Sequence, residues 1–283
     1  MTPLRLAIYS NQAWPFDVVR RWAAGAGHEI ALLVTVPERS DSETGHLGAM
    51  GVGASEVPVA VVRRVVDAAD RIASTAPDLG VIFSFNKLPD DIAGIPPCGT
   101  VNLHPALLPA HRGPNVFRAI FEGDRVIGST LHRIVNELDA GPILAQAACE
   151  VPDDVRPETV LGPWEETMME VLRVGVPMAA AGAPGQPQDV TGSTYAANFG
   201  LRDLVLDLAL PLRTLQGRAT ALLLAGQTPL VRLGGRSHRV RSLETHEGPP
   251  TTPPRLLSLT PDRARVAVPG GVVEVALDRS EQP

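Results

Sequence analysis

The sequence of 283 residues has few of the features that mark disulfide-bonded, metal-binding or membrane proteins. Its two cysteines, Cys98 and Cys149, are too few for a disulfide framework and lack zinc-ligand spacing. No apolar run approaches the roughly 18 residues that a membrane-spanning helix needs, and the first apolar segment, residues 4–10, is too short for a signal peptide. We therefore expect a cytoplasmic protein with no metal site and no membrane partner.

Positive charge is also scarce along most of the chain. The net charge is −6, and from Val205 onward ten Arg face seven Asp or Glu, which gives +3 there and leaves −9 for residues 1–204. The larger part of the chain therefore offers no overall electrostatic attraction to nucleic acid. A hydrophobic content of 44% is that of a globular protein that buries a sizeable core.

Apolar and amphipathic segments alternate over the first 190 or so residues. A strand over 4–10, a helix over 13–27 and a strand over 28–37 form a β-α-β unit, which requires parallel strands. A polar, Gly-rich segment over 38–56 is expected to be a flexible loop. The remaining pattern predicts helices near 61–76, 115–124 and 157–182, and strands over 79–85, 99–105, 126–135 and 141–151. The fold class is thus α/β, an open and mostly parallel sheet with helices on both faces.

The last part of the chain has a different pattern. Five short β-like runs, 229–235, 238–244, 254–260, 263–271 and 272–277, are separated by Gly and Pro. Runs of this length and spacing predict a small β-barrel-like (OB-like) domain. We expect a catalytic domain over 1–190, a linker over 191–209 and the small β domain over 210–283.

Three polar residues are candidates for catalysis. Asn102 and His104 stand two apart at the end of a predicted strand, so they face the same side of the sheet. Ligands of open α/β sheets bind outside the carboxyl ends of the strands, and Asp139 follows another strand just before a Gly-Pro turn. An amide N–H can stabilise an oxyanion, an imidazole can stabilise charge or move a proton, and a carboxylate can orient the imidazole. Together they predict acyl transfer without a covalent enzyme intermediate.

The segment around these residues resembles the folate-dependent formyltransferases. That family has Asn-x-His, then Leu-Leu-Pro, a basic residue with Gly, and later Leu-Asp-x-Gly. The matching elements here are Asn102-Leu103-His104, Leu107-Leu108-Pro109, Arg112-Gly113 and Leu138-Asp139-Ala140-Gly141. Four ordered elements within forty residues are a specific signal. Residues 4–37, the run 192–199 and, less specifically, the C-terminal β segments are also similar to the family.

The resemblance implies a Rossmann-type fold and transfer of a formyl group from 10-formyltetrahydrofolate to a primary amine through a tetrahedral intermediate. In that reaction Asn102 and His104 would stabilise the oxyanion, and Asp139 would order His104 and a water that relays a proton. The match further implies that the folate pocket is lined by Phe85, Asn86, Leu88, Ile134 and Asn136. Which group accepts the proton of the amine stays open.

The acceptor amine is expected to be a small molecule, such as an amino sugar or a specialised metabolite. The stretch 38–56 contains four acidic residues and one Arg, which makes it a poor partner for RNA phosphates. The first loop also lacks the glycines with which glycinamide ribonucleotide enzymes hold their phosphate. Methionyl-tRNA formyltransferase remains the alternative, because the C-terminal part is mildly basic. Transfer of formimidoyl or another one-carbon unit, a non-catalytic folate-binding role and a homodimer are also left open.

Two other histidines lie near the motif. The His-x6-His spacing of His104 and His111 is not a usual zinc spacing, and His132 lies in an alternating strand. Packing or surface roles are therefore expected for His111 and His132. The pair Trp14-Pro15 fits either the border of a substrate pocket or a hydrophobic helix start.

Overall fold

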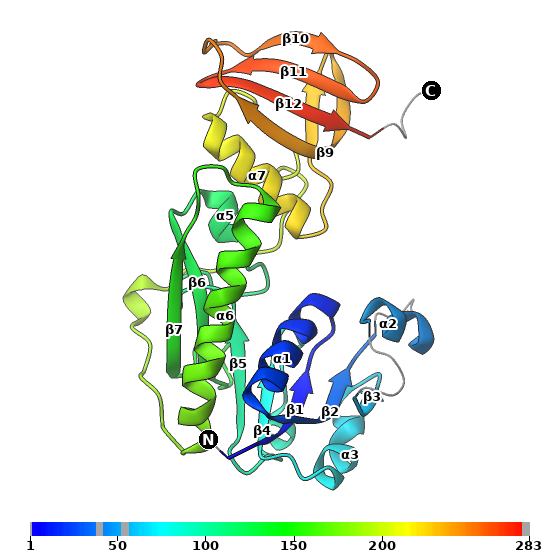
Figure 1. Cartoon of the computed structure of the whole chain (residues 1–283), viewed down its shortest axis with the longest axis vertical. Coiled ribbons are helices and arrows are strands. Elements are labelled where there is room, and N and C mark those ends of the chain that lie inside the picture. Colours follow the sequence, from blue (N-terminus) through cyan, green and yellow to red (C-terminus); the bar gives the residue numbers. More distant parts are fainter. Residues whose placement is uncertain (1, 38–41, 52–56, 279–283) are drawn as a thin grey trace. The chain divides into compact units, whose positions relative to one another are not determined.

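The computed structural model describes residues 2–37, 42–51 and 57–278 (Figure 1). The chain divides into two compact units. The first contains Met1–Arg112, Gly128–Ala148 and Trp164–Thr194, and the second contains Gly113–Ile127, Cys149–Pro163 and Tyr195–Pro283. Segments 113–127 and 149–163 therefore belong to the same unit as the C-terminal part. The domain boundaries expected from the sequence, 1–190, 191–209 and 210–283, remain a proposal.

A seven-stranded sheet forms the first unit, in the order β3-β2-β1-β4-β5-β6-β7. Its strands are β1 (Arg5–Tyr9), β2 (Glu29–Thr35), β3 (Val59–Val61), β4 (Leu79–Ile82), β5 (Thr100–His104), β6 (Val126–Arg133) and β7 (Ile143–Glu150). Strands β1 to β5 pair in parallel, whereas β6 runs antiparallel to β5. The expected open and mostly parallel α/β sheet is confirmed, and the carboxyl ends of β1, β4 and β5 lie at one edge.

The helices of this unit are set by local sequence signals. Helix α1 (Ala13–Ala26) buries an apolar stripe that includes Phe16, Val19 and Trp22, and it ends at Gly27, whose φ of 74° is the left-handed conformation that glycine adopts easily. The long helix α6 (Pro157–Ala180), of which the part from Trp164 onward belongs to this unit, begins with proline at its first position. Shorter elements are α2 (Glu43–Ala49), η1 (Val65–Ala68), α3 (Ala69–Ser74), α4 (Asp90–Ala93) and η2 (Val190–Gly192).

Two segments of this unit differ from what the sequence predicts. The segment 38–56 was expected to be a flexible loop, but residues 43–49 form α2, which is capped by Ser42 accepting a hydrogen bond from the Gly45 N–H. Residues 38–41 and 52–56 of that segment lie outside the described residues. The helix expected near 61–76 is divided into the end of β3, the turn η1 and the short helix α3.

An antiparallel sheet and two helices form the core of the second unit. The sheet has the order β10-β11-β12-β9-β8, with β8 (Leu230–Leu233), β9 (Arg236–His246), β10 (Arg255–Leu259), β11 (Arg263–Val268) and β12 (Gly271–Leu277). The curled sheet in Figure 1 agrees with the expected small barrel-like domain. Helix α7 (Leu212–Leu224), which packs against α5 (Arg118–Glu122) and β9, was not predicted, although Leu215, Ala219 and Leu222 have helical spacing. Among the described residues, no helix is long and apolar enough to cross a membrane.

Candidate active site

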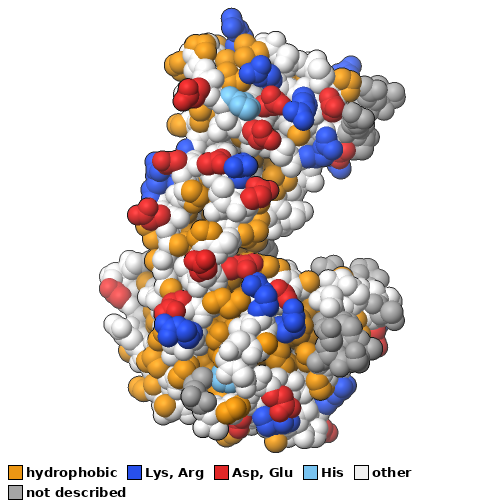
Figure 2. Space-filling model, viewed as in Figure 1, with side chains coloured by type: hydrophobic (Ala, Val, Ile, Leu, Met, Phe, Trp, Pro, Cys, Tyr) orange, Lys and Arg blue, Asp and Glu red, His pale blue; other side chains and the backbone are white. Residues whose placement is uncertain are grey.

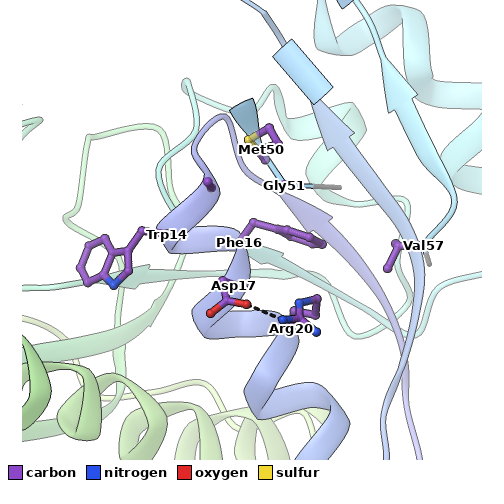
Figure 3. A pocket seen from close by; sticks show the side chains of 8 residues that line it. Trp14, Phe16, Asp17, Arg20, Met50, Gly51 and Val57 are labelled. Atoms are coloured by element: carbon purple, nitrogen blue, oxygen red, sulfur yellow. Dashed lines mark hydrogen bonds and ion pairs between the residues drawn. The ribbon is translucent and has the colours of Figure 1, made fainter. Parts of the chain in front are cut away.

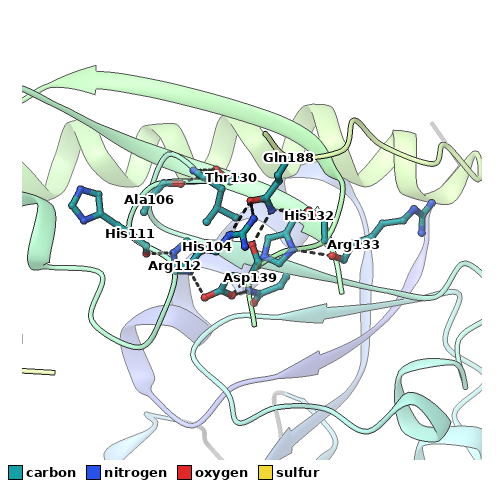
Figure 4. A network of polar contacts seen from close by, with 12 residues as sticks. His104, Ala106, His111, Arg112, Thr130, His132, Arg133, Asp139 and Gln188 are labelled. Carbon is teal, nitrogen blue, oxygen red and sulfur yellow. Dashed lines mark hydrogen bonds and ion pairs between the residues drawn. The ribbon is translucent and has the colours of Figure 1, made fainter. Parts of the chain in front are cut away.

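The antiparallel pairing of β5 with β6 brings four side chains to one face. Asn102 lies directly opposite His132, and His104 lies opposite Thr130. Side chains of directly opposed residues in such a pair point to the same face and touch. Figure 4 shows this cluster, with His104, His132 and Asp139 close together.

Asp139 completes the trio that the sequence predicts. Its Oδ1 accepts a hydrogen bond from Asn102 Nδ2 at 3.2 Å, and its Oδ2 lies 3.7 Å from His104 Nδ1. His104 and Asp139 are 4% and 6% exposed, so their interaction takes place largely out of water. The three residues come from the end of β5 and from the turn after β6, as expected from the carboxyl-end rule.

The turn that carries Asp139 is sterically demanding. Asp139 itself has a φ of 52°, an uncommon backbone conformation for a residue with a side chain. Two residues on, a Cβ added to Gly141 would lie 1.7 Å from the carbonyl oxygen of Arg133. The Asp-x-Gly part of the motif therefore has a packing reason, because only glycine lets the chain pass this close to β6.

The proton arrangement of His104 follows from its partners. Its Nε2 lies 2.9 Å from the carbonyl oxygen of His111, and a carbonyl can only accept, so Nε2 carries a hydrogen. The other ring nitrogen, Nδ1, faces Asp139. His111 presents this carbonyl from a residue with a φ of 56°. The main chain of His111 is therefore part of the site, whereas the sequence led us to expect only a packing or surface role for this residue.

His132 is a member of the site that the sequence reading did not identify. It is 2% exposed, its Nδ1 donates to the carbonyl of Arg133 at 2.8 Å, and its Nε2 therefore accepts from Asn102 Nδ2 at 3.1 Å. Burial lowers the pKa of His132 to about 4, and the nearby charges of His104 and Arg112 act in the same direction. His132 is therefore neutral near pH 7, and it fixes which end of the Asn102 amide faces Asp139.

The Pro-rich loop after β5 is held by two side chains of the sheet. Thr130 Oγ1 donates to the carbonyl of Ala106 at 2.7 Å and accepts from the Leu108 N–H at 3.1 Å. Gln146 Nε2 donates to the carbonyl of Leu108 at 2.7 Å. These bonds fix the loop 105–110, which directly follows His104.

The five expected folate-pocket residues fall into two groups. Leu88 is 5% exposed within a buried apolar cluster of the sheet, and the half-buried Phe85 and Ile134 pack against the same cluster. Asn86 and Asn136 are exposed at the surface. Phe85 and Ile134, which are 49 residues apart, thus pack against one cluster, whereas the structure shows no such packing for the two asparagines.

A separate cavity of about 320 Å³ lies along the first half of α1 (Figure 3). Trp14, Phe16, Met50 and Val57 contribute to its lining, together with an ion pair between Asp17 and Arg20. Trp14 therefore both begins a helix and borders a pocket. In the described part of the chain, no group of His, Cys, Asp and Glu is arranged to hold a metal ion.

Comparison with known proteins shows to which family this chain is similar. The pattern of the family described as Formyl transferase matches residues 60–169, which include Asn102, His104 and Asp139. A methionyl-tRNA formyltransferase from Roseiflexus sp. (strain RS-1) is 32% identical over 225 residues, which cover 74% of this chain and 67% of that protein. A second such protein, from Roseiflexus castenholzii, is 30% identical over 219 residues, which cover 74% of this chain and 69% of that protein.

Solved structures have the same fold at low sequence identity. HypX from Aquifex aeolicus in complex with tetrahydrofolic acid superposes with a TM-score of 0.71 at 17% identity, over 97% of this chain and 44% of that chain. WlaRD, a sugar 3N-formyl transferase, superposes with a TM-score of 0.63 at 12% identity, over the whole of both chains. The chain belongs to the folate-dependent formyltransferase family, whose members are transferases that use 10-formyltetrahydrofolate as formyl donor.

We predict that Gly141→Ala destabilises the protein by about 1–3 kcal/mol and lowers turnover, because the added methyl group must displace the Arg133 carbonyl or the Asp139 turn. Urea unfolding at pH 7 measures the change. Gly162→Ala is the matched control, because a Cβ there meets nothing within 4 Å on helix α6, so unchanged or slightly higher stability is expected. Equal stability of the two variants would contradict the steric argument.

The neutral state of His132 gives a pH prediction. Its pKa in the folded protein, about 4, lies below the ordinary 6.5, so the unfolded chain binds a proton between these values and the folded chain does not. The free energy of unfolding should therefore fall as the pH falls from about 6.5 toward 4. The groups facing His132 are Asn102, His104, Asp139 and Arg112.

The measurement is urea unfolding of the wild type and of His132→Gln at pH 7 and at pH 5. The variant should lose less stability than the wild type over this interval, because glutamine does not titrate. The same loss in both proteins would show that His132 does not contribute to the pH dependence.

Proposed function

We propose that the chain transfers the formyl group of 10-formyltetrahydrofolate to a primary amine by direct attack at the site formed by Asn102, His104 and Asp139. The observation that carries the proposal is the meeting of these three side chains at the carboxyl end of β5, where His104 and Asp139 are buried and Asn102 is half-buried. The amine nitrogen bonds to the formyl carbon, and the bond from that carbon to N10 of the folate then breaks. The amine loses one proton and N10 gains one, so the reaction needs no further reactant.

The side chains have distinct roles in this proposal. His104 presents Nδ1 toward the reaction centre because Nε2 is already bonded to the His111 carbonyl, so Nδ1 is the atom that stabilises the oxyanion or moves a proton. Both amide hydrogens of Asn102 are engaged in the structure, one with His132 and one with Asp139. To donate to the oxyanion, Asn102 must therefore share one of these two hydrogens. The hydrogen donated to Asp139 is the better candidate, because its bond is the longer of the two.

The residues expected to hold the folate fit a flat, mostly apolar ring. Phe85 and Ile134 leave part of their apolar surface open above a buried cluster, and Phe85 packs edge-on against Tyr9 with ring centroids 5.8 Å apart. Asn86 and Asn136 supply polar groups on the solvent side. In the proposal these residues orient the donor beside Asn102 and His104.

Methionyl-tRNA is the acceptor that the relatives favour. The curated proteins with 30% or more identity over about two thirds of their length are methionyl-tRNA formyltransferases. A small amine is the second candidate, and the net charge of −9 over residues 1–204 favours it, because that charge gives an RNA backbone no overall attraction. On the face shown in Figure 2, the acidic and basic side chains of the described residues are interspersed, which gives an RNA backbone no extended basic surface.

We predict that Asn102→Ala, His104→Ala and Asp139→Ala each lower formyl transfer by about 10²–10⁴-fold while folate binding is retained, because the substituted groups act on the reacting atoms. Release of tetrahydrofolate measures turnover, and titration with tetrahydrofolate measures binding. His246→Ala, on β9 of the second unit, is the control and should keep wild-type turnover. Unchanged turnover in all three site variants would refute the catalytic assignment.

The acceptor is tested by following tetrahydrofolate release with initiator methionyl-tRNA, nucleotide-linked amino sugars and small free amines, each supplied separately. Saturable turnover with the tRNA alone assigns the first candidate, and saturable turnover with one small amine alone assigns the second. Absence of turnover with every amine would contradict the proposed function.

A further inference from the structure

The side chain of Gln188 is bonded at both ends within the first unit. Its Nε2 donates to the carbonyl oxygens of Asp139 at 2.8 Å and Gly141 at 2.7 Å. Its Oε1 accepts from Nη2 of Arg112 at 2.7 Å and from Nε at 3.2 Å. These contacts use the donors and the acceptor of the carboxamide, so Gln188 connects two loops that are distant in sequence.

Each of these loops carries a part of the site. Asp139 belongs to the strained turn, and two carbonyls of that turn are held by one side chain. Arg112 directly follows His111, whose carbonyl receives the Nε2 hydrogen of His104. Arg112 is 7% exposed, and its Nη1 donates to Glu137 at 3.0 Å, so its guanidinium bonds to the turn of Asp139 as well.

The segment that carries Gln188 is anchored to the loop of His111 and Arg112. The main chain of Thr194 accepts from the Arg112 N–H at 3.0 Å, and Thr194 Oγ1 accepts from the His111 N–H at 2.8 Å. Gln188 therefore does not reach the turn from a free loop. Figure 4 draws Gln188 in one network of polar contacts with Arg112 and Asp139.

We propose that Gln188 is a positioning residue for the formyl-transfer site: it sets the orientation of the Asp139 carboxylate relative to His104 by clamping the 139–141 turn to Arg112. It does not touch the reacting atoms. This inference rests on the proposed function for its kinetic consequence, whereas the clamp itself is a property of the folded chain. The substitution Gln188→Glu keeps the acceptor for Arg112 but removes the donor for the two carbonyls. It therefore tests the bonds to the turn apart from the bonds to Arg112.

The test compares Gln188→Ala and Gln188→Glu with Gln186→Ala. Gln186 is exposed and bonds to Ile143 through its main chain, so the same truncation two residues away leaves the turn untouched. Both Gln188 variants should lose about 100-fold in kcat with KM for 10-formyltetrahydrofolate within about twofold of wild type, because a small misplacement of a catalytic group affects the chemical step most. Gln186→Ala should keep wild-type kcat.

Hydrogen-deuterium exchange of a peptide covering residues 137–143 gives a readout that does not depend on turnover. Its main-chain amides should exchange faster in Gln188→Ala than in wild type or Gln186→Ala, while peptides of β1 and β4 stay unchanged. Wild-type exchange of this peptide in Gln188→Ala, or a kcat equal to that of Gln186→Ala, would overturn the inference. If the wild type formylates no amine, the proposed function fails, and the exchange experiment still decides whether Gln188 clamps the turn.

Discussion

The antiparallel pairing of β6 with β5 is the interaction on which the site depends. Every other strand pair on the β1 to β5 side of the sheet is parallel, and this one reversal places His132 opposite Asn102 and brings the chain back to Asp139 seven residues later. Side chains alternate along a strand, so a register one residue different would turn His132 away from Asn102 and separate Asp139 from both. Both faces of β6 are buried from Ile127 to His132, so a slip would also take the buried hydroxyls of Ser129 and Thr130 away from their hydrogen-bond partners.

The polar groups gathered by this pairing are stable only as a set. A buried carboxylate needs hydrogen-bond donors, and Asp139 accepts a hydrogen bond from Asn102, while Nδ1 of His104 lies 3.7 Å from its other oxygen. His132 contributes by being an acceptor at Nε2, which engages the second amide hydrogen of Asn102 and determines the orientation of the amide. A charged His132 would lose that acceptor. The low pKa of His132 is therefore connected to the geometry of Asn102. Burial favours the neutral imidazole, and only the neutral imidazole can accept the hydrogen bond from Asn102.

The sequence predicts those parts of the site whose signal lies in a short stretch of the chain. Asn102 and His104 are two apart on one strand, and Leu-Asp-x-Gly marks a tight turn, so the trio could be assembled from the motif and the rule for strand ends. His132 and Gln188 were not identified, because their roles depend on strand register and on a segment about 50 residues away in the chain. Helix α7 was missed although its apolar spacing is helical, since the β-like runs that follow it dominated the reading of that region. The main-chain carbonyl of His111 has no signal in the side-chain sequence at all.

The site and the acceptor are specified by different parts of the chain. Chemistry at the formyl carbon requires the trio, the β6 pairing and the turn, and these lie within the region that matches the family pattern. In the proposal, the groups that would distinguish a transfer RNA from a small amine lie outside this region, on α1 and on the described residues between β2 and β3. Glu43 in α2, the Asp17–Arg20 pair and the apolar lining of the α1 cavity do not form the row of unpaired cations that a phosphate backbone attracts. Identity near 30% to transfer-RNA enzymes is therefore a stronger argument for the reaction than for the acceptor, because the reaction depends on the matched residues and the acceptor on the surface around them.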